Sequence, residues 1–128
     1  MGPRRRANGE RGGAAVEAAI VLPLLVLIVF GIIEFGRGYN ANLTITHAAR
    51  EGARVLALGG TEAEATQTVI DAAPELDGAQ ITVVTSGAPC VAGTPATVTV
   101  SYPVAYTIPL FDEGTWTLTE MGAMECVA

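Results

Sequence analysis

The stretch that decides the fold is RGGAAVEAAIVLPLLVLIVFGIIEF, from Arg11 to Phe35. It opens with small residues and one carboxylate, Glu17, and the run 18–33 that follows has no charged or hydrogen-bonding side chain. As a helix that run would be about 24 Å long, slightly less than the ~30 Å hydrocarbon core of a bilayer. The small residues before it supply the missing length. We therefore expect a transmembrane helix at about residues 14–34.

Charge divides the chain into a basic start and an acidic remainder. The formal net charge is −6, whereas residues 1–12 carry four arginines and one glutamate, so the remainder carries −9. Basic residues before a span favour a cytoplasmic N-terminus, with the rest outside the cytoplasm. Nucleic-acid binding needs a basic face. We therefore expect a membrane as partner, and no nucleic acid.

The helix is expected to continue beyond the span, so that residues 13–58 form one long N-terminal helix. Pro23 should kink it, because its ring removes one hydrogen bond and crowds the preceding turn. The pair Gly59-Gly60 should end it. Residues 1–12 are rich in glycine and arginine and lack an apolar period, which predicts a disordered leader.

Residues 59–128 are expected to form a small α+β head outside the cytoplasm. Thr61 and Glu64 have the spacing of a capping box, which predicts a short helix at Glu62–Ala73. After Gly78 the apolar period changes to two. Strands are then expected at residues 80–86, 96–102 and 115–127. Turn residues separate these strands, so they should pair as an antiparallel sheet.

The two cysteines, Cys90 and Cys126, both follow the apolar run. Outside the cytoplasm they can pair, and an intramolecular bridge is the simplest interpretation. It would close a loop of roughly 36 residues and stabilise the head by about 4 kcal/mol in the chain-entropy model. The head has about 70 residues, a size at which a core alone is marginal.

The sequence contains few residue patterns that are typical of a catalytic site. His47 is the single histidine, and Glu51 follows it one helical turn later. This pair would allow an acid–base or metal site, but there is no second histidine and no Cys-x-x-Cys. No nucleophile has a base at recognisable spacing, and no glycine-rich phosphate loop follows a strand. We expect a protein that is not an enzyme and binds no cofactor or metal.

Two blocks of the sequence resemble the TadE-like pseudopilins of the tight-adherence (Flp) type IV pilus system. The first is RGGAAVE followed by VLPL and FGIIEFGR, and the second is HAAREGAR at residues 47–54. Together they cover about residues 11–58. The resemblance implies a pilin-like fold with a long bent membrane helix. It also implies cleavage by a membrane prepilin peptidase between Gly12 and Gly13, which makes Glu17 the fifth mature residue.

Two points of the processing signal depart from the usual pattern. Ala18 stands where Flp-type signals usually carry an aromatic residue, and cleavage after Gly13 remains a second register. A carboxylate such as that of Glu17 costs roughly 3 kcal/mol inside a membrane. The α-amine that cleavage creates on Gly13, in the same or a neighbouring subunit, would be its partner. The alternative is a solvated carboxylate at the interface.

The residues of the second block could contact either another subunit or the chain's own sheet. Arg50, Glu51 and Arg54 are candidates for a contact with another subunit, and Glu51 can pair with Arg54 at i,i+3. The small residues of the same block favour docking of the helix on its own sheet; these are Ala48, Ala49, Gly52 and Ala53. Just after the span, Glu34 and Arg37 can pair in the same way as an interfacial anchor.

These features predict a minor pilin or pseudopilin that takes part in assembling a Tad/Flp-type type IV pilus. Its partners would be the prepilin peptidase, other pilins or pseudopilins, and the pilus assembly platform. It would reside in the cytoplasmic membrane and enter a surface pilus. One alternative is the major filament subunit. Another is an uncleaved, signal-anchored binding module. A secretory signal peptide fits poorly, because no cleavage motif follows the apolar run.

Overall fold

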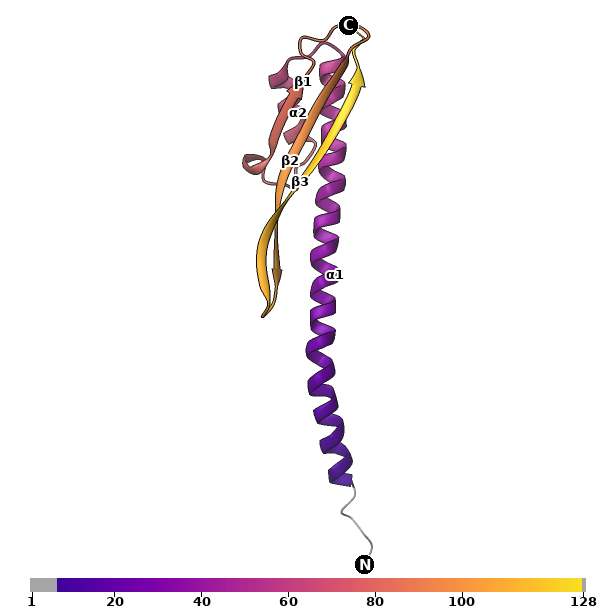
Figure 1. Cartoon of the computed structure of the whole chain (residues 1–128), viewed down its shortest axis with the longest axis vertical. Helices are drawn as coiled ribbons and strands as arrows, with labels where there is room; N and C mark the ends of the chain where they lie inside the picture. Colours follow the sequence, from indigo (N-terminus) through magenta and orange to yellow (C-terminus); the bar gives the residue numbers. More distant parts are fainter. Residues whose placement is uncertain (1–6, 128) are drawn as a thin grey trace, which may run out of the picture.

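The computed structural model describes residues 7–127, which form a long helix with a small head at its C-terminal end (Figure 1). In chain order the elements are α1 (Ala7–Ala57), α2 (Glu62–Asp71), the short 3-10 helix η1 (Gly78–Gln80), β1 (Thr82–Ser86), β2 (Pro95–Ile108) and β3 (Asp112–Glu125). The head therefore combines one short helix with a three-stranded antiparallel sheet. This confirms the predicted α+β fold class.

Helix α1 is continuous over 51 residues and includes Pro23. Figure 1 shows that it changes direction gently in its N-terminal half. The helix begins at Ala7, so residues 7–12 are helical where we expected a leader without structure. Extending an existing helix needs no new nucleus, which lets the span propagate backwards through these residues. The arginines at positions 4–6 lie outside the described residues.

The end of α1 is a Schellman motif built on the glycine pair. Gly59 has a φ of 88°, the left-handed conformation that glycine adopts without steric cost. Its amide donates to the carbonyl of Leu56, and the amide of Gly60 donates to that of Val55, both at 2.9 Å. The helix ends at Ala57, one residue before the predicted boundary.

Helix α2 begins with the predicted capping box. The amide of Glu64 donates to Thr61 Oγ1 at 3.2 Å, and the amide of Thr61 donates to Glu64 Oε2 at 2.7 Å. The Thr61 amide and hydroxyl both donate to the Glu64 carboxylate, and these two bonds stabilise its ionised form and lower the pKa of Glu64. Ala65 and Val69 of α2 are fully buried against α1 and the sheet.

The sheet has the order β1-β2-β3, with antiparallel pairs such as Val84–Thr99 and Val98–Gly122. β1 is two residues shorter than expected, and β2 continues six residues past its predicted end, to Ile108. β3 begins three residues before its predicted start and ends two residues before its predicted end. β2 and β3 form a long hairpin. The second strand was expected to end at residue 102, just before Pro103. However, β1 pairs with β2 only up to Ser101, so the proline lies where β2 has become an edge strand. Proline is tolerated there.

The core lies where the C-terminal part of α1 packs on the sheet. Ala48, Ala49 and Ala53 are fully buried, so the small residues of the second block dock on the chain's own head. Gly122 of β3 faces the backbone of Ala49, and a Cβ at Gly52 would lie 2.7 Å from Val69 Cγ2. The two glycines therefore permit close approach of α1 to both partners.

The Cys90–Cys126 disulfide is present and fixes the C-terminal end of the chain. Backbone bonds support the same corner: the Cys126 amide donates to the Thr94 carbonyl at 2.8 Å, and the Val127 amide donates to the Ala57 carbonyl at 3.1 Å. The end of β3 is thereby joined to the loop before β2 and to the end of α1. The predicted disulfide is confirmed.

Candidate functional site

The candidate processing segment lies on the first turns of α1. Gly12, Gly13 and Glu17 are all exposed, and a Cβ at either glycine would meet nothing within 4 Å. Within residues 7–127, Glu17 makes no hydrogen bond or ion pair. The chain itself thus supplies no described partner for this carboxylate, and the segment is open to another molecule.

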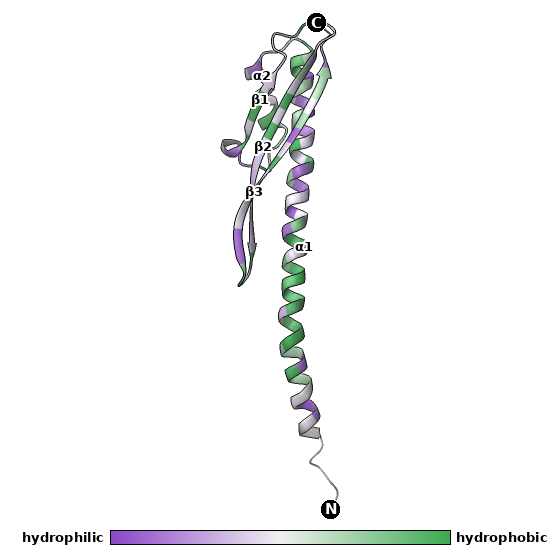
Figure 2. Ribbon diagram, in the orientation of Figure 1, coloured by the Kyte–Doolittle hydropathy of each residue, from purple (hydrophilic) through white to green (hydrophobic). Residues whose placement is uncertain are grey.

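The apolar surface that follows has no partner within the described head. Every large apolar side chain from Val16 to Phe35 except Leu27 is exposed, and Leu27 is half-buried. Helix α1 is long enough and apolar enough to cross a bilayer, and its most apolar 18-residue stretch has a mean hydropathy of 2.8. Figure 2 shows the hydrophobic part of α1 lying mostly below the head. One long N-terminal apolar helix of this kind fits a single-pass membrane protein.

An ion pair marks the end of the apolar surface nearest the head. Arg37 Nη1 donates to Glu34 Oε1 at 3.2 Å, which confirms the predicted i,i+3 pair. The Glu34 side chain is 17% exposed, whereas that of Arg37 is 69% exposed. The guanidinium therefore reaches solvent while the carboxylate lies partly covered by the hairpin. An i,i+3 ion pair on a helix surface contributes only a few tenths of a kcal/mol.

The charged residues of the second block lie on the outer face of α1. His47, Arg50 and Arg54 are exposed, and Glu51 is half-buried. The Glu51–Arg54 pair that the spacing allows does not form. Among residues 7–127 the single ion pair is that of Glu34 and Arg37. The two arginines thus face outward beside a helix face that is already docked, which leaves them free for another molecule.

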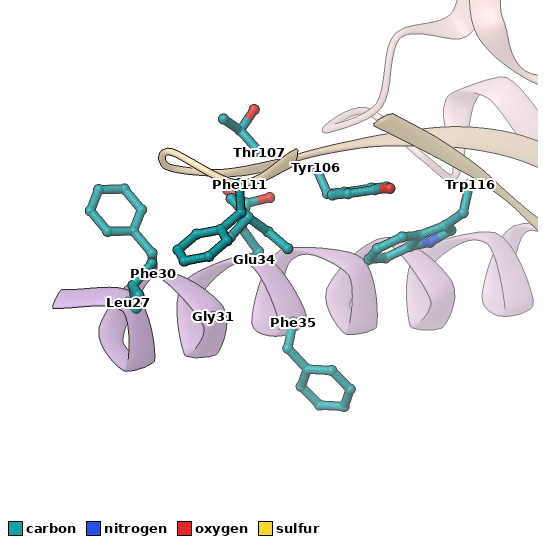
Figure 3. A pocket seen from close by; sticks show the side chains of 10 residues that line it. Leu27, Phe30, Gly31, Glu34, Phe35, Tyr106, Thr107, Phe111 and Trp116 are labelled. Carbon is teal, nitrogen blue, oxygen red and sulfur yellow. The ribbon is translucent and has the colours of Figure 1, made fainter. Parts of the chain in front are cut away.

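The sequence did not reveal that the β2–β3 hairpin reaches along α1 to the apolar run. Between them lies a cavity of about 440 Å³, lined by residues such as Phe30 and Gly31 of α1 and Phe111 and Trp116 of the hairpin side (Figure 3). The Tyr106 and Trp116 rings stack at 5.3 Å between centroids. The alternation Val104, Tyr106, Ile108 was the available signal for the longer strand.

Comparison with known proteins gives a match in the part of α1 that holds the candidate processing segment and the apolar run. The family model described as TadE-like protein matches residues 12–54. The chain carries a TadE-like segment. No curated protein and no solved structure gives a significant match.

The TadE-like segment contains the span, the Glu34–Arg37 pair and the second block, and it ends before the head begins at residue 59. Its first residue is Gly12, where the processing signal was located from the sequence. The resemblance to TadE-like proteins is therefore confirmed over about one third of the chain.

Proposed function

We propose that this chain is a structural minor pilin or pseudopilin, without catalytic activity, that takes part in assembling a Tad/Flp-type pilus. The observation that carries the proposal is the coincidence of three features in the TadE-like segment. These are the glycines of the processing signal, Glu17 four residues later, and an apolar helix surface with no partner in the described head. A soluble binding module would need none of the three.

Processing by a prepilin peptidase would convert the span into an assembly element. Cleavage after Gly12 creates an α-amine on Gly13, about one helical turn from Glu17. In a filament the two groups of neighbouring subunits would neutralise each other, and the axial stagger between subunits would bring them together. The exposed apolar surface of α1 would then pass from lipid to a bundle of similar helices, burying about the same area.

The head would lie outside the cytoplasm, beyond the membrane end marked by Glu34 and Arg37. The basic residues before the span favour this orientation, and the Cys90–Cys126 disulfide is typical of an oxidising compartment. Arg50 and Arg54 are exposed on the C-terminal part of α1, which packs on the sheet, at the height where neighbouring heads would meet. We assign these two arginines to contacts with other pilins or with the assembly platform.

The proposal is tested with Glu17 variants in cells whose own copy of the gene is deleted. Glu17→Gln removes the charge while keeping the size of the side chain. We expect normal amounts of protein in the membrane but roughly tenfold fewer surface pili by electron microscopy, because an unpaired amine remains in each contact. Intact mass of the membrane form separates a processing defect from an assembly defect.

Glu10→Gln is the matched control. It makes the same chemical change on the same helix, but in the segment that processing would remove. We expect pili in normal number from this variant. Normal piliation by Glu17→Gln, or by cells that lack the chain altogether, would contradict the proposed function.

A further inference from the structure

The most exposed apolar group of the head lies at the end of the β2–β3 hairpin. We define the hairpin tip as residues 108–111. Leu110 is 102% exposed and Phe111 is 75% exposed, and Ile108 beside them is 43% exposed. Three of four residues in this turn therefore present large apolar side chains outside the core. A turn in water normally carries polar residues or glycine.

The backbone of the tip makes its composition more unusual. The Phe111 amide donates to the Ile108 carbonyl at 3.1 Å, with Pro109 at the second turn position. Leu110, at the third, has a φ of 69°. These features fit a type II turn, whose third position strongly favours glycine or asparagine. A leucine held there, with its side chain outside the core, does not help the head to fold. Such an outlier suggests a role outside the chain.

The tip lies beside the apolar run of α1. The cavity between them is lined by Leu27 and Phe30 from α1 and by Ile108 and Phe111 from the hairpin. Figure 3 shows Phe111 pointing toward α1, and Figure 2 shows the tip at the height of the hydrophobic part of that helix. From Glu34 back to Leu27 a helix rises about 10 Å. The tip therefore lies one to two turns inside the apolar run.

We propose that the hairpin tip is a second membrane contact, inserted into the leaflet nearest the head, with acyl chains occupying the cavity against α1. Acyl chains are the expected occupant of the cavity, because the tip adjoins the apolar surface of α1 that lipid must cover and lies at the same height. The inference rests on the membrane span alone. It does not depend on peptidase processing or on a pilus.

The insertion is shallow. Beyond Ser101, β2 has no β1 partner, so both outer edges of the hairpin carry unpaired backbone groups that cannot enter hydrocarbon. Asp112 and Glu113 follow the tip directly and mark the height of the aqueous boundary. The Tyr106 hydroxyl donates to Asp112 Oδ2 at 3.2 Å, which holds the first of these carboxylates at the hairpin. The 5–10 Å depth typical of interfacial anchors suits this arrangement.

Fluorescence in lipid vesicles tests the contact. The full-length chain has one tryptophan, so Trp116→Phe supplies a background that keeps an aromatic ring against Tyr106. In that background Leu110→Trp places an indole at the tip. At low protein density in phosphatidylcholine vesicles, lipids brominated near the headgroup end of their acyl chains should quench this indole at least about twofold.

Val91→Trp in the same background is the matched control. Val91 is also an exposed apolar residue, but it follows Cys90 at the disulfide end of the head, far from the span. Its indole should respond to acrylamide in the water and not to brominated lipid. Equal acrylamide access at positions 110 and 91 would overturn the proposal. A second result would also overturn it: no quenching of the indole at position 110 by brominated lipid at low protein density, together with protection of that indole from acrylamide at high protein density. That result would assign the tip to a contact with a second copy of the chain.

The unmodified chain provides a measurement that needs no substitution. Vesicles that contain a photoactivatable phosphatidylcholine, with the reactive group on the acyl chain, should label two separate regions. Adducts are expected within residues 16–33 and again within residues 108–111, with none at residues 88–95. Labelling of the span without the tip would overturn the proposal, whatever the behaviour of the tryptophan variants.

Discussion

Replacing Gly122 with alanine should destabilise the head, because β3 and α1 approach backbone to backbone at this position. A Cβ on Gly122 would lie 2.5 Å from the Ala49 carbonyl carbon and 2.7 Å from the Arg50 nitrogen. Ordinary contacts between such atoms are about 3.5–4.0 Å. Neither atom can rotate away, so α1 and β3 would have to separate by roughly 1 Å.

The magnitude follows from two opposing terms. Overpacking of a core costs about 1–3 kcal/mol, and contacts with rigid backbone place Gly122→Ala at about 3 kcal/mol. Alanine is better than glycine within a strand by roughly 0.5–1 kcal/mol. We therefore expect the free energy of unfolding to fall by about 2 kcal/mol. A loss of this size is a large part of the stability of a small domain.

The assay is urea unfolding of the full-length chain in mild detergent without reductant, followed by the fluorescence of the single tryptophan. Ala123→Val is the matched control, since Ala123 is the next residue along β3 and is exposed. Its effect should stay within about 0.5 kcal/mol. An unchanged or increased stability of Gly122→Ala would refute the close docking of β3 on α1 and with it the placement of the head.

Three further predictions concern stability and local structure. Replacing both Cys90 and Cys126 with serine should lower the free energy of unfolding by about 4 kcal/mol in the same urea assay, because a loop of 36 residues is released. The pKa of Glu64 is lowered from 4.5 in the folded head, so its contribution to stability is present above about pH 4.5 and lost as the pH falls through the folded value. Glu64→Gln should remove that part of the acid dependence in unfolding curves between about pH 3 and 6. A Cβ at Gly38 would lie 2.8 Å from Trp116 Cζ2, so Gly38→Ala should move the indole away from α1 and shift its emission, while the higher helix propensity of alanine offsets about 1 kcal/mol of the cost.

Local signals were sufficient for much of the fold. The apolar run located the span, the glycine pair located the end of α1, and the Thr61–Glu64 spacing located the start of α2. In each case the determining interaction joins residues within about one or two helical turns. The small residues at 48–53 also predicted docking on the sheet, because only small side chains allow two backbones to approach so closely.

Long-range geometry could not be obtained in the same way. The hairpin extends past Pro103 because β1 stops at Ser101, a fact that depends on the pairing of strands and not on the local sequence. The approach of Phe111 to the apolar run joins segments about 80 residues apart. For the same reason, the spacing of Glu51 and Arg54 allowed an ion pair, but the orientation of α1 on its sheet determines which side chains meet, and this pair does not form.

We propose that the TadE-like segment is a processed pilin signal. The measurement that tests it most directly is the N-terminal sequence of the protein isolated from its own membranes, with and without the prepilin peptidase. Processing at this signal predicts a chain that starts at Gly13 when the peptidase is present and at Met1 or Gly2 when it is absent. A start at Met1 or Gly2 in both strains would contradict it and leave only a signal-anchored membrane protein.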